Sequence, residues 1–206
     1  MADKYLNKYR IPSARWATWD YGANAPYFVT ICTHNMRHHF GKVKNGEMQY
    51  TPLGQSAYDC WMDIPAHFPF VVLDAFVVMP NHVHGILVFN KCGVVEPQDI
   101  AAKEKGMEPQ DIAAKEAWEE TQYLASVRDK WQINKFGPQS RNLASVLRGF
   151  KVGVTKFAHQ NDLSFKWHVR FHDHVVRDEA EWKRIAHYIE NNPRKWSEDK
   201  FYGEDG

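Results

Sequence analysis

The amino-acid sequence predicts an α+β fold, in which an antiparallel sheet has helices packed on it as a ferredoxin-like sandwich. Segments of aromatic and β-branched residues alternate with amphipathic segments in the order strand, helix, strand, strand, helix, strand, helix. Two of the expected strands, Val71–Met79 and His82–Phe89, are separated only by Pro80-Asn81. So short a connection predicts a hairpin and therefore antiparallel pairing.

The first half of the chain begins with a strand at Tyr27–Thr33, which is rich in aromatic and β-branched residues. Thr51-Pro52 then starts a helix, because proline suits the first helical position. We expect Pro65 to close this helix. Its apolar stripe consists of Leu53, Ala57, Cys60, Trp61 and Ile64.

The second half opens with an amphipathic helix. Gly149 and Gly153 each cost it about 1 kcal/mol relative to alanine, so we expect them to permit a close backbone approach. Its apolar residues are Leu143, Val146, Leu147, Phe150, Val154 and Phe157. A strand is expected over Trp167–Val176.

The last helix has a start and a stop signal. Asp178 caps it, with Glu181 three residues on as in a capping box. Asn191-Asn192-Pro193 ends it, since the residue before a proline is disfavoured in a helix. Its expected buried stripe is Trp182, Ile185, Ala186 and Ile189.

A chain of 206 residues suits one domain, which we assign to 1–206. The nonapeptide EPQDIAAKE occurs at Glu96–Glu104 and again at Glu108–Glu116, so we expect a flexible repeat insertion at 93–122. Eight acidic residues and three lysines give Glu96–Glu120 a net charge of −5, which leaves +6 on the rest of a chain of net charge +1. This imbalance favours a polyanionic partner.

No apolar run is long enough to cross a bilayer, and the first residues have no signal-peptide core. A cytoplasmic protein without a membrane partner is therefore expected. The three cysteines, Cys32, Cys60 and Cys92, form no Cys-x-x-Cys pair, which argues against a thiolate zinc site.

Two histidines at the start of one expected strand are the sharpest local feature. Side chains alternate along a strand, so His82 and His84 project from one face, about 7 Å apart. Two imidazoles so placed can share a divalent ion. Alternatively, they are hydrogen-bonded or surface histidines of an edge strand. The apolar residues on both sides of the pair favour the interpretation that the two histidines bind a metal ion.

Two further groups are ambiguous by themselves. Tyr188 and Asn192 share one face of the last helix, beside its apolar stripe, where a boundary tyrosine and a capping asparagine are ordinary. His168, His172 and His174 alternate along the expected strand Trp167–Val176. They indicate either a separate metal site of a hydrolytic enzyme or polar residues that face solvent.

The motifs YFVTICTHN at 27–35, WMDIPAHFP at 61–69, FVVMPNHVHGILV at 76–88, FHDHVVR at 171–177 and HYIENNPRKW at 187–196 occur together and in this order. In this combination the chain resembles the REP-associated tyrosine transposases of the HUH single-tyrosine transposase superfamily. The resemblance implies an HUH nuclease fold and a metal-dependent enzyme that cleaves and rejoins single-stranded or hairpin DNA through a covalent 5′-phosphotyrosine. Both a monomer and a homodimer are compatible with it.

Carried over by motif, the resemblance makes His82 and His84 metal ligands, Tyr188 the nucleophile and Asn192 a third polar ligand. Imidazole and amide ligation suits Mg²⁺ or Mn²⁺. Arg148, Lys151 and Lys156 lie off the centre of their helix's apolar stripe, and we expect them to contact nucleic acid unless that face is simply solvated. The alternative function is a catalytically inactive single-stranded nucleic-acid-binding module of the same fold.

Overall fold

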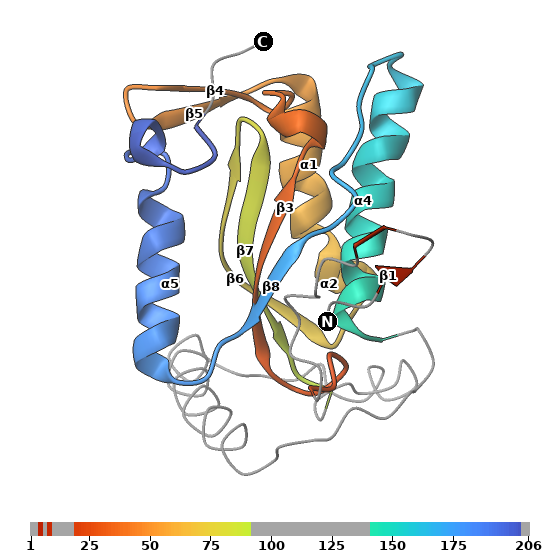
Figure 1. The fold of residues 1–206 in the computed structure, drawn as a ribbon, viewed down its shortest axis with the longest axis vertical. Helices are drawn as coiled ribbons and strands as arrows, with labels where there is room; N and C mark the ends of the chain where they lie inside the picture. The colour runs from red at the N-terminus through yellow and green to blue at the C-terminus, as the bar shows by residue number, and fades with distance from the viewer. Residues whose placement is uncertain (1–3, 6–7, 10–18, 92–140, 203–206) are drawn as a thin grey trace, which may run out of the picture.

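The computed structural model describes residues 4–5, 8–9, 19–91 and 141–202 (Figure 1). The predicted insertion at 93–122 and its tandem repeat lie outside these residues. Within the described part of the chain, no helix combines the length and the apolar character needed to cross a membrane.

A four-stranded antiparallel sheet forms the centre of the molecule, in the order β6-β7-β3-β8. The strands are β3 (Pro26–Cys32), β6 (Val71–Met79), β7 (His82–Phe89) and β8 (His172–Val175). The hairpin of β6 and β7 has the predicted bounds. The predicted fold class, an antiparallel sheet with packed helices, is confirmed.

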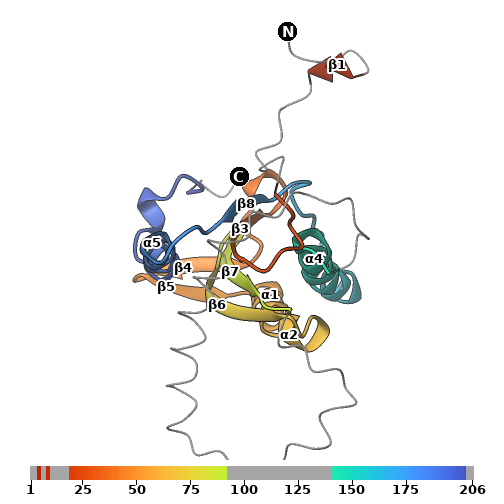
Figure 2. The ribbon, with the colours of Figure 1, turned by 90° about the horizontal axis from the view of Figure 1, so that it is seen from below.

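Helices cover both faces of this sheet (Figures 1 and 2). On one face lie α1 (Pro52–Met62), α2 (Ile64–His67) and α4 (Leu143–Gln160), and on the other lies α5 (Glu179–Asn191). Small hairpins form from β1 (Lys4–Tyr5) with β2 (Lys8–Tyr9), and from β4 (Gly41–Lys44) with β5 (Glu47–Tyr50). Short 3-10 helices are η1 (His34–Met36) and η3 (Trp196–Glu198).

Strand β7 is buried along its whole length, so each of its faces contributes to a different apolar cluster. Val83 and Leu87 belong to the larger cluster with α1 and α4, whereas Ile86 and Val88 pack with α5. Gly85 lies on the α1 side, where a Cβ atom would come within 2.3 Å of the Trp61 ring. The absence of a side chain at Gly85 therefore allows the indole to lie directly on the strand.

The two glycines of α4 also permit a close approach, as predicted. A Cβ on Gly149 would lie 3.0 Å from the Phe68 ring, and one on Gly153 would lie 2.9 Å from Cys60 Sγ. Helix α4 thus packs closely against the α1–α2 segment.

Two local predictions were wrong. Helix α1 ends at Met62, and Pro65 lies in the first turn of α2 instead of closing α1. Asp178 does cap α5 by accepting from Glu181 N at 2.8 Å, but the Glu181 carboxylate accepts from Arg177 N, so the capping box is not reciprocal. The predicted stop at Asn191-Asn192-Pro193 is confirmed, since α5 ends at Asn191, although Asn192 itself keeps a helical backbone.

The strand predicted over Trp167–Val176 was also wrong in extent, because β8 begins only at His172. The Trp167 ring packs against Phe150 and Phe165, and its Nε1 donates to Lys151 O at 3.2 Å. Trp167 itself forms only an isolated bridge with Thr33, and the residues between it and β8 lie outside the sheet, so Val169 is 89% exposed.

Candidate active site

His82 and His84 project from β7 toward α5, and their ring centroids are 4.4 Å apart. The two residues are 0% and 1% exposed. Strand β7 lies inside the sheet between β6 and β3, so these are not surface histidines of an edge strand. The strand itself holds both imidazoles together in a buried position.

The hydrogen bonds of Asn81 determine the protonation of His82. Asn81 Nδ2 donates to two carbonyl oxygens, Met36 O at 3.1 Å and Phe201 O at 2.8 Å. Its Oδ1 therefore faces His82 Nδ1, at 2.8 Å, and can only accept. Nδ1 must carry the proton, which leaves a lone pair on Nε2. That buried Nε2 has no hydrogen-bond partner.

His84 is held in a similar way from the neighbouring strand. Its Nδ1 lies 2.9 Å from Thr30 Oγ1, and its ring stacks on Phe28 with a centroid distance of 5.5 Å. Burial is the main cause that lowers the pKa of both histidines, to about 3 for His82 and well below its ordinary value for His84. Both imidazoles are therefore neutral at physiological pH, the form that binds metals.

Tyr188 reaches this pair from α5. Its Oη lies 3.2 Å from His84 Nε2 and donates to Asp199 Oδ2 at 3.2 Å. The residue is 41% exposed, so its hydroxyl meets both the buried histidines and solvent. Burial and then the Asp199 carboxylate raise the pKa of Tyr188 to about 12, while a hydrogen bond with Asn192 lowers it. Such a phenol needs help to become a nucleophile at neutral pH.

Asp199 is a member of the site that sequence reasoning missed. Its ligand oxygen and the ring nitrogens of His82 and His84 all lie within 4.8 Å of one another. Its Oδ1 accepts from Phe201 N at 2.7 Å, so a local turn after η3 orients the carboxylate. No periodicity or motif marks this aspartate in the sequence, because η3 and the turn alone bring it back to the strand.

Asn192, the predicted third ligand, lies at the C-terminal end of α5 and is 2% exposed. Its Nδ2 donates to Asp199 Oδ2 at 2.8 Å, and its Oδ1 is buried without a partner. The structure thus brings together His82, His84, Tyr188 and Asn192, and adds Asp199. Two neutral imidazoles, a carboxylate and an amide oxygen could hold a divalent cation, and the unpartnered His82 Nε2 and Asn192 Oδ1 fit that ligand set.

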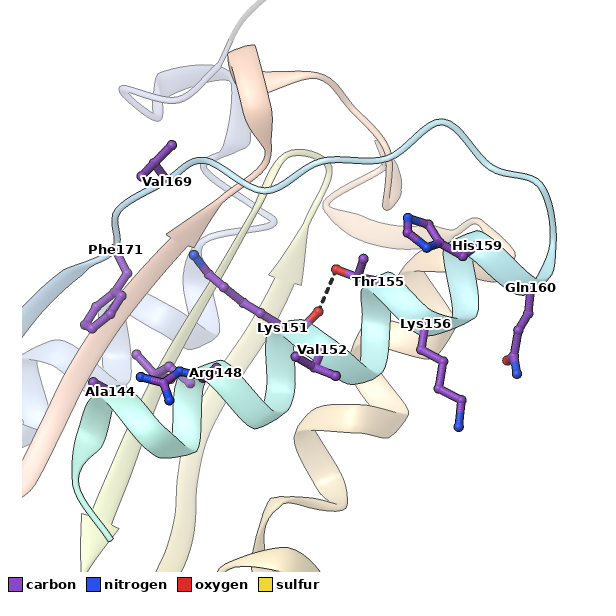
Figure 3. Close-up of a pocket in the computed structure, with 11 residues that line it drawn as sticks. Ala144, Arg148, Lys151, Val152, Thr155, Lys156, His159, Gln160, Val169 and Phe171 are labelled. Atoms are coloured by element: carbon purple, nitrogen blue, oxygen red, sulfur yellow. Dashed lines mark hydrogen bonds between the residues drawn. The ribbon is translucent and has the colours of Figure 1, made fainter. Parts of the chain in front are cut away.

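The predicted nucleic-acid contacts Arg148, Lys151 and Lys156 lie on α4, across the sheet from Tyr188. Together with Val169 and Phe171 they line a cavity of about 760 Å³ between α4 and the segment before β8 (Figure 3). Lys151 Nζ donates to His168 O at 3.1 Å, and burial lowers the pKa of its ammonium group. Three cations therefore share one cavity, separated from the histidine pair by the sheet.

His168, His172 and His174 do not converge. His168 precedes β8, and His174 Nε2 lies 2.9 Å from Glu181 Oε1, next to the start of α5. Among the described residues, the group of three potential metal ligands is His82, His84 and Asp199. The structure does not support a separate metal site at the Trp167–Arg177 histidines.

The chain is 34% identical to an uncharacterized protein of Haemophilus influenzae over 191 residues, which cover 92% of each protein. The chain belongs to the same family as that protein. No protein-family model matches this chain.

Among solved structures, the fold is similar to that of a REP-associated tyrosine transposase bound to a REP hairpin. The TM-score is 0.52 and the identity 16%, over 92% of this chain and 77% of the other. At this identity the likeness shows a shared fold, and it agrees with the observed antiparallel sheet between helices.

Proposed function

We propose that the protein is a metal-dependent enzyme that cleaves and rejoins single-stranded DNA through a covalent 5′-phosphotyrosine on Tyr188. One observation carries the proposal: Tyr188 Oη lies 3.2 Å from His84 Nε2, beside the His82, His84 and Asp199 group. A similar fold in a transposase bound to a REP hairpin supports a hairpin-forming nucleic acid, which we take to be DNA, as the substrate. The proposal also places the protein in the cytoplasm.

In this proposal His82, His84 and Asp199, with Asn192 beside them, hold Mg²⁺ or Mn²⁺. A bound divalent ion would offset negative charge that develops on the scissile phosphate. Tyr188 Oη forms a bond to the phosphorus, and the bond from phosphorus to the 3′ oxygen breaks. Asp199 Oδ2 already accepts the phenolic hydrogen bond and is placed to take that proton. The 3′ oxygen takes a proton from solvent water and leaves as a hydroxyl.

Rejoining is the reverse reaction. The 3′ hydroxyl of a second strand attacks the phosphotyrosine phosphorus, and Tyr188 leaves and regains its proton. The covalent bond to the protein keeps the energy of the broken phosphodiester, so no nucleotide hydrolysis is required.

Arg148, Lys151 and Lys156 are proposed to contact the DNA backbone away from the reacting phosphate. Their shared cavity, with the Phe171 ring on one wall, supports this role (Figure 3). Cations beside an aromatic side chain suit an unpaired strand, whose phosphates and bases are both accessible.

The decisive test is Tyr188→Phe, which removes one oxygen and keeps the ring. We expect no denaturant-resistant adduct when this variant is incubated with hairpin-bearing single-stranded oligonucleotides and Mn²⁺, whereas the wild type forms one. DNA binding should persist, and stability should change by only about 0.5–1.5 kcal/mol, the usual worth of one hydrogen bond. Tyr50→Phe, at a tyrosine of similar exposure whose ring packs against Tyr58 of α1, is the matched control.

An adduct that survives in Tyr188→Phe would overturn the assignment of the nucleophile. If the wild type binds the oligonucleotide but never forms an adduct, the alternative of an inactive binding module of the same fold is the correct one.

A further inference from the structure

A second cavity, of about 480 Å³, lies between the β4–β5 hairpin and the segment that follows α5. Lys42 and Arg194 give it two positive charges, and no aspartate or glutamate is among the described residues that line it. Its principal lining residues are His38, Lys42, Pro80, Arg194, Trp196 and Tyr202. A cavity with this charge attracts an anionic ligand.

The cavity adjoins the histidine pair through one indole. The Trp196 ring lies 5.9 Å from the His82 ring and 5.7 Å from the His38 ring, measured between centroids. Pro80, in the turn that leads into β7, belongs to the same wall. A ligand in this cavity would therefore lie beside the metal ligands, on the same face of the sheet as Tyr188.

The walls combine aromatic rings with a positioned cation. Tyr202 is 53% exposed, and its ring meets Trp196 at a centroid distance of 5.5 Å. Gly46, with φ of 77°, makes the tight turn of the β4–β5 hairpin, and a Cβ there would lie 3.3 Å from Arg194 Cγ. The hairpin turn thus packs on the stem of Arg194 and holds this arginine at the cavity.

We propose that this cavity binds one unpaired nucleotide of the DNA strand, next to the nucleotide whose phosphate reacts with Tyr188. Lys42 and Arg194 neutralise its phosphate, and Tyr202 stacks on its base. The inference rests on the proposed function and adds a substrate subsite to it. Cations favour any anion, but the exposed aromatic ring beside them favours a nucleotide over an acidic peptide.

The test measures DNA binding without cleavage. A fluorescently labelled oligothymidine is titrated with metal-free full-length protein carrying Tyr188→Phe, at several salt concentrations, and its anisotropy is recorded. Lys42→Gln and Arg194→Gln should each weaken binding about three- to ten-fold and reduce the slope of log K against log salt by about 0.7, the value for one contact to a single strand. Lys44→Gln and Lys195→Gln are charge-matched controls that lie outside the cavity lining.

Variants of Tyr202 test whether the cavity binds the base of the nucleotide. Tyr202→Ala should weaken binding about five-fold or more, as expected for loss of a stacked ring, whereas Tyr202→Phe should bind like the parent protein. If the cation variants weaken binding but Tyr202→Ala does not, the cavity recognises charge alone and the nucleotide assignment is overturned.

The two proposals fail separately. If wild-type protein forms the Tyr188 adduct while Lys42→Gln and Arg194→Gln bind like their controls, the proposed subsite is overturned and the proposed nuclease activity is supported. If these variants and Tyr202→Ala lose affinity as expected but no adduct ever forms, the proposed nucleotide-binding cavity is supported and the proposed nuclease activity is overturned.

Discussion

The chemistry of individual residues in this site depends on which nitrogen of each imidazole carries the proton. Asn81 commits both of its N–H groups to carbonyl oxygens, so its remaining oxygen directs the His82 proton to Nδ1. Asn81 is thus a positioning residue. Its loss would free the His82 ring to rotate and to exchange its two nitrogens, although the imidazole itself would remain.

The low pKa of His82 makes the stability of the metal-free protein depend on pH. The pKa is about 3 in the folded state and about 6.5 in an unfolded chain, so only the unfolded state binds a proton between these values. Stability contributed by neutral His82 is therefore present above pH 6.5 and is lost as the pH falls toward 3. At pH 5 the loss should be about 2 kcal/mol.

Urea unfolding at pH 7.5 and pH 5 measures this loss. His82→Gln cannot titrate, so it should lose about 2 kcal/mol less between the two pH values than the wild type. His159→Gln, at an exposed histidine, should behave like the wild type. Equal losses in wild type and His82→Gln would show that His82 is not held neutral by the fold.

The site residues differ in how far the sequence could predict them. His82 and His84 follow from strand alternation, and Tyr188 with Asn192 from helical spacing together with the family motif. Asp199 could not be found, since its place depends on a 3-10 turn and on the backbone N–H of Phe201, ten residues beyond the end of α5. The cations of α4 were recognisable as a group, but only the packing shows that the sheet separates them from the histidines.

Among the secondary-structure elements, β7 contributes to the candidate site with one face and to the main hydrophobic core with the other. Its α5 face carries the candidate metal ligands His82 and His84, and its α1 face contacts Trp61 through Gly85. The predicted bounds of β6 and β7 were right because a two-residue turn separates long apolar runs. The strand predicted at Trp167 was too long because a tertiary contact, the insertion of the indole under α4, overrides local alternation.

Gly85→Ala tests how closely α1 determines the position of β7. The new methyl group would lie 2.3 Å from Trp61 Cζ2, so the indole or the strand must move. We expect a loss of about 1–3 kcal/mol, as for other overpacked cores, measured as a lower denaturant midpoint at unchanged slope.

Gly149→Ala is the matched control for this change. Its methyl group meets the Phe68 ring at 3.0 Å, but alanine also favours the helix by about 1 kcal/mol, so the net effect should be smaller. A Gly85→Ala protein as stable as wild type would mean that β7 and α1 can separate freely.

At the scale of the whole molecule, the candidate ligands join distant parts of the chain. His82 and His84 come from β7, Asn192 from the end of α5 and Asp199 from the segment after η3. The order of strands and helices, and hence the fold class, could be predicted from periodicity and turn residues. The single-domain assignment and the insertion at 93–122 stay predictions, because the insertion lies outside the described residues.

A cation bound by this set should stabilise the folded state. With Mn²⁺ at a hundred times its Kd, the gain is about 2.7 kcal/mol. For a chain of this size it corresponds to an increase in Tm of about 5–10 °C, measurable by differential scanning fluorimetry. His82→Ala should abolish most of this increase. An equal increase in wild type and His82→Ala would place the ion elsewhere.

The contact between His84 and Tyr188 spans 104 residues of sequence, which matters while the protein is being made. A ribosome adds about 5–20 residues per second, so the histidine hairpin leaves the exit tunnel about 5–20 s before the tyrosine. A nascent or prematurely terminated chain that ends before α5 contains the histidines but lacks Tyr188. If Tyr188 is the nucleophile, as proposed, such a chain cannot become covalently attached to DNA, and the order of synthesis itself delays cleavage until translation is almost complete.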